Sequence, residues 1–207
     1  MSQQKPLIIV LGPSGSGKNN IIRRILASPL FTGIFLPTTS VTSRPMRVTE
    51  TEGKEYFFRT LPQFLQMVDE GRFLEHQNVY PDTTMEPRLY GTLWSEIDRV
   101  EKVEDKIPML EVDLHGGVRV REVYGDRVKL IFIMPRSIED LVEQIKARDP
   151  SLPPDLEARM IRAKQEMEEA HDVCDYIVHN HPPTIEPAAA KVEQIIHEIL
   201  LQHQVLV

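Results

Sequence analysis

The stretch "LIIVLGPSGSGKNN" (residues 7–20) decides the fold, because a short apolar run leads directly into a glycine-rich loop. A continuous apolar run of this length is typical of a strand that is buried on both faces of a parallel sheet. The loop matches the phosphate-loop pattern G-x-x-x-x-G-K-[ST] at Gly12, Gly17 and Lys18. Only the last position departs, because Asn19 stands where serine or threonine would offer a hydroxyl to Mg²⁺.

A loop that joins a buried strand to a helix directs its backbone N–H groups, and the positive end of the helix dipole, toward a phosphate chain. Lys18 would reach the terminal phosphates as a point charge. We therefore expect a nucleoside triphosphate on this loop, and the alternative is a strand–helix turn without a ligand. The residues expected to contact ATP are Gly12, Pro13, Ser14, Gly15, Ser16, Gly17, Lys18, Asn19 and Asn20.

The length of the chain, 207 residues, suits one compact domain. A net charge of −7 argues against a protein that coats nucleic acid, because such binding relies on Lys and Arg. No apolar run approaches the ~18 residues of a membrane span. The N-terminal "MSQQKPLIIVLG" is interpreted as a strand and not as a secretory signal, so we expect a cytoplasmic protein without a membrane partner.

Two further apolar runs of strand length, 107–112 and 128–134, are separated from the first by segments of helical periodicity. This alternation predicts the α/β class, with a mainly parallel sheet flanked by helices. Helix start signals are found at Thr60, at Thr92, and at Ser137 with Asp140. The predicted helices span about 17–28, 61–70, 92–105, 116–124, 137–148, 155–171 and 188–203.

Two segments interrupt this alternation. Residues 36–90 combine short β-like pieces with turn residues and one short helix. We interpret them as a mixed β subdomain that is inserted into a core formed by 1–35 and 91–207. In "RDPSLPPDLEAR" three prolines break the helical pattern, which predicts a small lid at about 146–160.

The inserted segment contains "SVTSRPMRVTETEGKEYFF" (40–58), in which Arg44 and Arg47 flank a proline. Pro45 favours an extended backbone at Arg44, and in a polyproline-like segment residues i and i+3 lie on one side. Two guanidinium groups can then bind one phosphate, and Tyr56 can add a hydroxyl donor. A solvated turn is the alternative for this stretch taken alone.

These motifs together resemble the guanylate kinase family. The stretches "GPSGSGK", "SVTSRPMRVTETEGKEYFF", "GRFLEH", "LYGT", "LEVDLHG", "IFIMPRSIEDL" and "CDYIVHN" follow in that family's order over about residues 6–200. The resemblance implies a P-loop nucleoside-monophosphate-kinase-like fold and an enzyme of purine nucleotide metabolism that transfers the γ-phosphate of ATP to GMP. It also implies a site in which Arg44, Arg47, Tyr56 and Tyr90 hold the GMP phosphate, Ser40, Glu75, Thr92 and Asp113 surround guanine, and Asn180 lies beside adenine.

The chemistry of the base supports the assignment of Glu75. Guanine presents N1–H and N2–H₂ as adjacent donors, which match the two oxygens of a carboxylate, whereas adenine lacks this pair. Ser40 can donate to O6, so a site of this kind rejects AMP by leaving buried polar groups unpaired. Two alternatives stay open: Glu75 as the outward residue of an edge strand, and Asp113 as the cap of a helix that begins near "HGG".

The resemblance also implies the residues of phosphoryl transfer. The family's lid supplies two arginines eleven residues apart, and Arg148 and Arg159 have this spacing. Together with Lys18 and Arg44 they are the predicted catalytic residues, because transfer depends on neutralising charge on the transferred group. Mg²⁺ is the expected cofactor, and its expected ligands are Asn19 and Glu111, directly or through water.

Three departures from the family pattern leave the function open to alternatives. Asn19 replaces a hydroxyl residue, the segment 75–90 is several residues longer than usual, and Gln144 replaces an arginine. A catalytically weak or inactive binding module of the same fold is one alternative, and a kinase with another acceptor such as dGMP is a second. In the leading interpretation the partners are ATP and GMP, without nucleic acid, and the protein is a monomer or homodimer.

Overall fold

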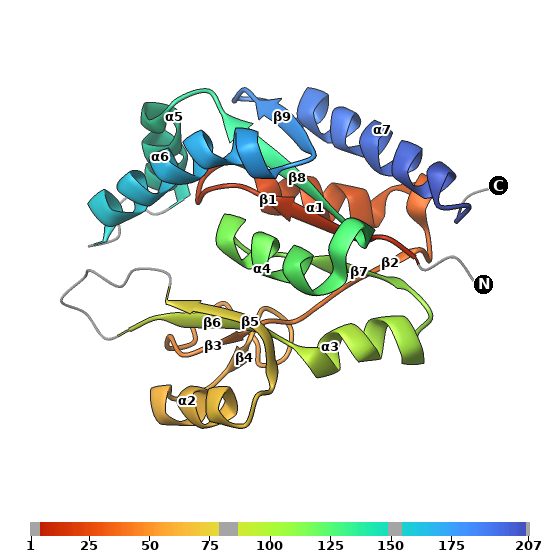
Figure 1. Ribbon diagram of the computed structural model, residues 1–207. Coiled ribbons are helices and arrows are strands. Elements are labelled where there is room, and N and C mark those ends of the chain that lie inside the picture. Colours follow the sequence, from red (N-terminus) through yellow and green to blue (C-terminus); the bar gives the residue numbers. More distant parts are fainter. Residues whose placement is uncertain (1–4, 79–86, 149–154, 206–207) are drawn as a thin grey trace.

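The computed structural model describes residues 5–78, 87–148 and 155–205. Its larger sheet has five parallel strands in the order β2-β7-β1-β8-β9. The strands are β1 (Leu7–Leu11), β2 (Phe35–Pro37), β7 (Ile107–Leu110), β8 (Val128–Pro135) and β9 (Tyr176–Asn180). The prediction of a mainly parallel sheet flanked by helices is therefore confirmed (Figure 1).

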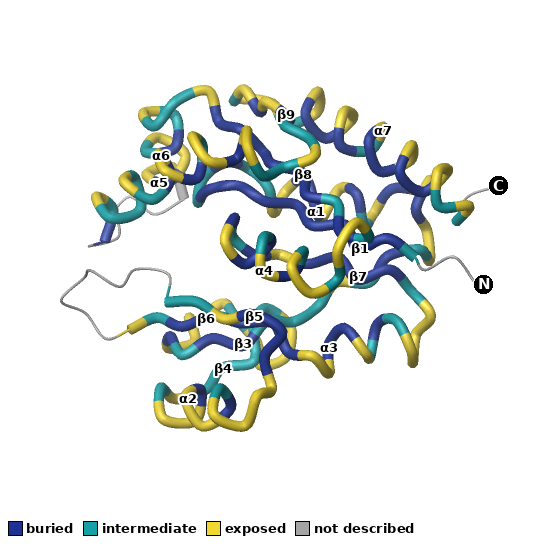
Figure 2. Tube along the Cα trace, in the orientation of Figure 1, coloured by how far each residue is buried: buried dark blue, intermediate teal, exposed yellow. Residues whose placement is uncertain are grey.

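The central strand β1 is apolar throughout because helices cover both faces of the sheet. Ile8 and Val10 pack into the cluster under α1 and α7, whereas Ile9 packs into the cluster under α4 and α6. This alternation follows from the two-residue period of a strand. The buried colour of the strands and the exposed outer faces of the helices are visible in Figure 2. The covering helices are α1 (Lys18–Ala27), α4 (Leu114–Tyr124), α6 (Leu156–Val173) and α7 (Glu186–Gln202).

The second sheet has four strands in the order β4-β3-β6-β5 and lies beside the first (Figure 1). It packs on α2 (Leu61–Asp69) through a core of its own, which contains Phe64 and Phe73. The sheet extends beyond residue 90, where the sequence placed its end, because β6 pairs with β5 as far as Leu93. The strands are β3 (Val41–Thr42), β4 (Phe57–Phe58), β5 (Phe73–Asn78) and β6 (Leu89–Leu93).

Two of the three predicted helix starts are confirmed. Thr60 forms a capping box with Gln63 at α2, and Ser137 Oγ accepts from the backbone N–H of Asp140 (3.2 Å). The start at Thr92 is wrong, because Thr92 pairs with Glu75 in the β5–β6 ladder. The remaining helical segments are η1 (Pro29–Phe31), α3 (Trp94–Asp98), η2 (Arg99–Val103), η3 (Gly125–Arg127) and α5 (Ile138–Arg148).

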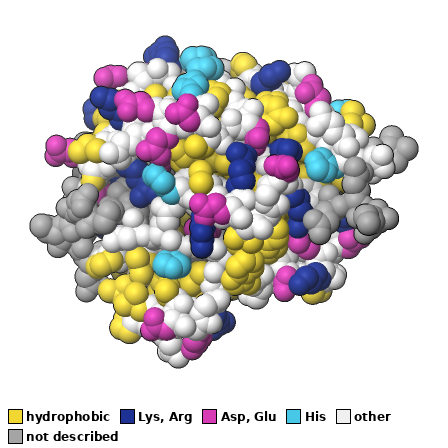
Figure 3. Space-filling view, viewed as in Figure 1, with side chains coloured by type: hydrophobic (Ala, Val, Ile, Leu, Met, Phe, Trp, Pro, Cys, Tyr) yellow, Lys and Arg dark blue, Asp and Glu magenta, His cyan; other side chains and the backbone are white. Residues whose placement is uncertain are grey.

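The described helices and the exposed charged side chains add two observations on this fold. Within residues 5–78, 87–148 and 155–205, no helix combines the length and the apolar character that crossing a bilayer requires. Side chains of both charge signs are interspersed over the face shown in Figure 3.

Candidate active site

The phosphate loop leaves β1 and ends at Gly17, the N-cap of α1. Gly17 adopts φ 87°, and a Cβ there would lie 2.6 Å from Nδ2 of Asn180, so both conformation and space require glycine. Among the described residues no side chain caps α1, which leaves its first N–H groups for an anion. The loop therefore has the backbone geometry that the sequence predicted for phosphate binding.

Asn180, at the end of β9, supports this loop from behind. Its Nδ2 donates to the carbonyl oxygen of Ser16 (2.8 Å), and the residue is only 4% exposed. Asn180 therefore supports the phosphate loop through its amide nitrogen. The adenine contact that the family resemblance implied for Asn180 stays a prediction.

Lys18 and Glu111 meet where the loop and the end of β7 converge. Nζ of Lys18 lies 3.8 Å from Oε1 of Glu111. Asn19 is exposed on the first turn of α1. Glu111 and Asn19 offer carboxylate and amide oxygens, the kind of donor that Mg²⁺ prefers. The described residues contain no group of three His, Cys, Asp or Glu side chains that could hold a metal ion.

The two arginines of the inserted segment converge on one carboxylate. Arg44 donates to both oxygens of Glu50 (2.7 and 2.6 Å), and Nη1 of Arg47 lies 3.8 Å from the same side chain. Hydrogen bonding to Arg44 lowers the pKa of Glu50 to about 2. The structure thus orients both guanidinium groups toward a single anion.

Two tyrosines complete this end of the site. The guanidinium of Arg44 lies 5.0 Å from the ring centre of Tyr56, and the rings of Tyr56 and Tyr90 meet edge to face at 5.7 Å. Burial and the negative charge of Glu111 raise the pKa of Tyr56, so its hydroxyl stays protonated and can donate.

Glu75 lies on the edge strand β5, but it points inward. It pairs with Thr92 in register, and it is 7% exposed. A Cβ at Gly116 would lie 3.0 Å from Oε2 of Glu75, so the carboxylate packs against the first turn of α4. Burial raises the pKa of Glu75 to about 7, and the charge of Asp113 adds to this shift. Glu75 is thus an inward-facing, buried carboxylate and not the outward residue of its strand.

Asp113 both caps α4 and takes part in a wider polar network. Its Oδ1 accepts from the N–H of Gly116 (2.8 Å) and from Nε2 of Gln77 (2.7 Å). Its Oδ2 accepts from Arg162 on α6. The capping alternative is therefore correct, and both carboxylate oxygens already have protein donors.

Ser40, the remaining residue expected around guanine, is half-buried directly before β3. Its carbonyl oxygen accepts from the N–H of Phe57 (2.9 Å), which ties it to β4. Thr92 is fully buried on β6. Both residues therefore belong to the inserted sheet that carries Glu75.

The structure describes only part of the two arginines predicted for the lid. Arg148 is the last residue of α5, and its side chain lies outside the described residues, as do 149–154. Arg159 donates to both oxygens of Asp155 (3.0 and 3.1 Å). Asp155 also accepts from Arg88, directly before β6, at 3.4 Å. The long segment noted in the sequence falls largely on residues 79–86, which are also outside the described residues.

Sequence reasoning missed four polar residues of this site. Glu50 is a carboxylate three residues after Arg47, a spacing that could have identified it as an internal partner. Arg162 and Glu166 are spaced i, i+4 on α6, which indicates an ion pair but not its position in the fold. Gln77 follows Glu75 on the same face of β5, and no sequence signal marks it.

A phosphate loop on a parallel sheet, beside an inserted mixed sheet that carries arginines, tyrosines and a buried carboxylate, defines a P-loop kinase of the nucleoside-monophosphate class. The family model of guanylate kinase matches residues 3–199 of this chain. Similar proteins include the guanylate kinases of Salinibacter ruber (31% identity; 92% of this chain and 96% of the relative) and Bacteroides thetaiotaomicron (36%; 94% and 89%). The chain belongs to the guanylate kinase family.

A solved structure shows the same fold. The guanylate kinase of Anaplasma phagocytophilum superposes with a TM-score of 0.66 at 24% identity, covering 95% of this chain and 87% of that one. The fold expected from the sequence is thereby confirmed.

Proposed function

We propose that this protein transfers the γ-phosphate of ATP to GMP and so produces ADP and GDP. Its membership of the guanylate kinase family supports the reaction. The geometry of the described residues supports the roles assigned below to individual side chains.

The proposal rests on a series of contacts that connects the phosphate loop with Glu75, the residue predicted to bind guanine. Glu111, just after β7, approaches Lys18 at 3.8 Å. Two residues later, Asp113 caps α4, and the first turn of α4 packs against Glu75 through Gly116. A triphosphate on the loop and a purine beside Glu75 would then share the end of β7, as direct transfer between two bound nucleotides requires.

Phosphoryl transfer needs positioning and charge neutralisation and no protein nucleophile. An oxygen of the GMP phosphate attacks the γ-phosphorus of ATP in line, and the bond from that phosphorus to the bridging oxygen of ADP breaks. Lys18 neutralises charge on the terminal phosphates, while Arg44 and Arg47, oriented by Glu50, hold the acceptor phosphate. Arg148 and Arg159 would add positive charge from the lid, and lid closure would exclude water.

Glu111 and Asn19 would hold Mg²⁺, directly or through water, since both offer oxygen donors near Lys18. When bound with ATP, the metal would supply positive charge that offsets the charge of the phosphates. The division into core, insertion and lid, the cytoplasmic location, the monomer or homodimer state and the absence of a nucleic-acid partner stay predictions from the sequence.

The proposed function is tested by ADP release from the purified protein with ATP and Mg²⁺, in the presence of GMP, dGMP or AMP. We expect release that depends on GMP and that AMP does not support. Release with dGMP at the same rate would extend the acceptor range to deoxyribose. No release with any acceptor, together with intact GMP binding, would instead identify a binding module.

The Asn19→Ser variant tests the unusual metal contact. A serine hydroxyl lies one bond nearer the backbone than the asparagine amide oxygen, so it restores the spacing of the phosphate-loop pattern. We expect GMP-dependent ADP release to rise by about tenfold, the value of one contact of about 1.4 kcal/mol. Thermal stability should stay unchanged, because the side chain at this position is exposed. An unchanged rate would show that Asn19 does not limit metal binding.

GMP binding should weaken as the pH falls. The Glu75 carboxyl accepts the N–H groups of guanine only when ionised, and burial raises its pKa to about 7 in the free protein. Between pH 8 and pH 6 the ionised fraction falls roughly tenfold, so the Kd of GMP measured by calorimetry should rise roughly tenfold. The GMP phosphate also titrates near pH 6, and the Glu75→Gln variant reports that contribution alone. Parallel pH profiles for the two proteins would contradict the role of Glu75.

A further inference from the structure

Asp113 lies near two other carboxylates, one on the inserted sheet and one on α6. Glu75 comes from β5, Asp113 from the N-terminus of α4, and Glu166 from α6. A Cβ at Gly116 would lie 3.0 Å from Glu75 Oε2 and 3.3 Å from Asp113 Oδ1. Burial raises the pKa of both Glu75 and Glu166, and the charge of Asp113 adds to each shift. A cation among these buried carboxylates stabilises their ionised forms.

Arg162 supplies that cation. Its guanidinium donates to Oδ2 of Asp113, to Oε1 of Glu166 (3.0 Å) and to Oε1 of Gln77 (2.8 Å). Among the described residues it is the one Lys or Arg that forms an ion pair with Asp113 or Glu166, and none pairs with Glu75. The fork geometry of an arginine allows these simultaneous bonds.

As a result of this pairing, the three carboxylates differ in their partners. Asp113 has both oxygens occupied, by Gly116 and Gln77 on one side and by Arg162 on the other. Glu166 is paired with Arg162 and is only 3% exposed. Of the three carboxylates, Glu75 is the one that forms no ion pair with a Lys or Arg among the described residues.

We propose that Arg162 is a positioning residue that determines how the acceptor base is read. By neutralising Asp113 and Glu166, it leaves Glu75 as the single carboxylate that receives the guanine N–H groups. This inference rests on the proposed function. Arg162 also joins two elements directly, because it donates from α6, the helix that carries Arg159, to Gln77 on β5, the strand that carries Glu75.

The test compares Arg162→Met, which keeps the aliphatic stem, with Arg162→Lys, which keeps the charge. Lys164→Met is the matched control, because Lys164 is an exposed cation on the same helix. Calorimetry with GMP alone and with ATP alone gives the two dissociation constants for each protein. We expect Arg162→Met to raise the Kd of GMP at least tenfold and to change the Kd of ATP less than twofold. Arg162→Lys should recover GMP affinity to within about threefold of the parent, and the control should match the parent.

A double-mutant cycle separates charge neutralisation from simple packing. If Arg162 acts by pairing with Asp113, then Arg162→Met should cost less than threefold in GMP affinity when Asp113 is already asparagine. An equal cost in both backgrounds would overturn the inference. So would equal losses of ATP and GMP affinity accompanied by a lower Tm, or an Arg162→Met protein that binds GMP as the parent does. A parent protein that binds no GMP would instead overturn the proposed function.

Discussion

Replacing Lys18 with alanine is expected to lower kcat for GMP phosphorylation by about a thousandfold. The ammonium group stands at the end of the phosphate loop, 3.8 Å from Glu111, where the terminal phosphates of ATP would lie. Its positive charge is needed most in the transition state, in which charge spreads over the oxygens of the transferred group. The loss should therefore appear in kcat more than in the KM for GMP.

The Lys18→Ala substitution should change the free energy of unfolding very little. The pair with Glu111 is long and partly solvated, with 17% of the Lys18 side chain and 39% of the Glu111 side chain exposed, and such pairs contribute about 1 kcal/mol or less. Steady-state rates and a thermal melt of the same preparation check both statements. Lys164→Ala, an exposed lysine on α6, is the control. A loss of less than tenfold would show that Lys18 does not face the transferred phosphate.

Glu75→Gln is expected to lower kcat/KM for GMP by a hundredfold to a thousandfold. The carboxylate can accept both adjacent donors of guanine, whereas the amide offers one acceptor and turns a donor toward a donor. Hydrogen bonds to charged groups contribute about 1.5–3 kcal/mol each, which gives a loss of this size. Turnover with AMP should stay near background. The amide at position 75 changes one group of the site and does not supply the other hydrogen-bond partners that adenine would need.

The same substitution should stabilise the free protein. The pKa of Glu75 is raised to about 7 in the fold, above its unfolded value near 4.5, so the ionised form is disfavoured by folding. This destabilisation grows as the pH rises from about 4.5 to 7 and is complete above pH 7. Removing the charge should then raise the unfolding free energy at pH 8 by about 1–3 kcal/mol, as measured by denaturant titration. Equal losses of activity and stability would indicate a structural role for Glu75.

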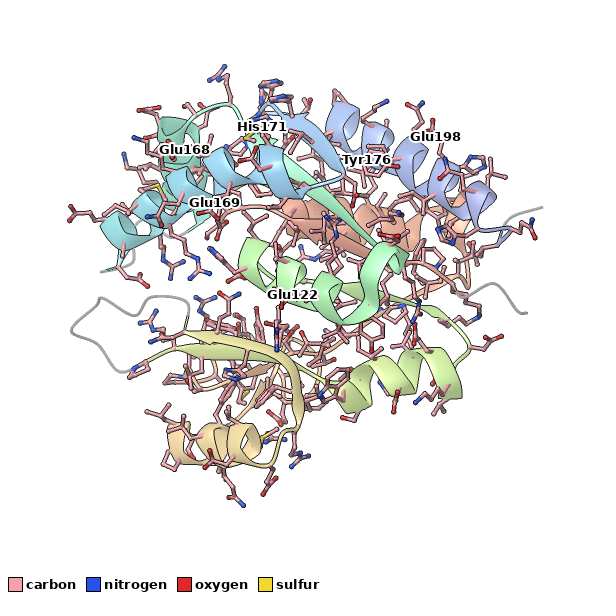
Figure 4. All side chains as sticks on the ribbon, viewed as in Figure 1. Glu122, Glu168, Glu169, His171, Tyr176 and Glu198 are labelled. Atoms are coloured by element: carbon pink, nitrogen blue, oxygen red, sulfur yellow. The ribbon has the colours of Figure 1, made fainter. Side chains whose placement is uncertain are left out.

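The remaining ion pairs of α6 show how a helix surface is used in this fold. Glu169, labelled in Figure 4, extends from α6 on the side of α4, and its Oε2 lies 3.3 Å from Nε2 of His115. Farther toward the N-terminus of α6, Arg162 and Asp155 contact the core and the inserted sheet. The helix α6 thus forms polar contacts both with the core and with the inserted sheet.

Local patterns were sufficient for most of the fold. The apolar runs, the helix periods and the capping residues Thr60 and Ser137 placed the strands and helices, because these signals act within a few residues. The signal at Thr92 misled because a ladder pairing with Glu75 outweighs a capping preference. The residues of the phosphate loop, and both arginines of the acceptor segment, were likewise visible in the sequence.

The sequence by itself determined the family, and it predicted a triphosphate loop, a pair of arginines for the acceptor phosphate and a carboxylate for guanine. Only the tertiary structure decided which of these groups are already paired. It buried Asn180 behind the loop, engaged Arg44 with Glu50, and joined Asp113 to an arginine 49 residues away. The physical reason is that sequence patterns report local backbone geometry, whereas pairing among buried charges depends on which distant elements pack together.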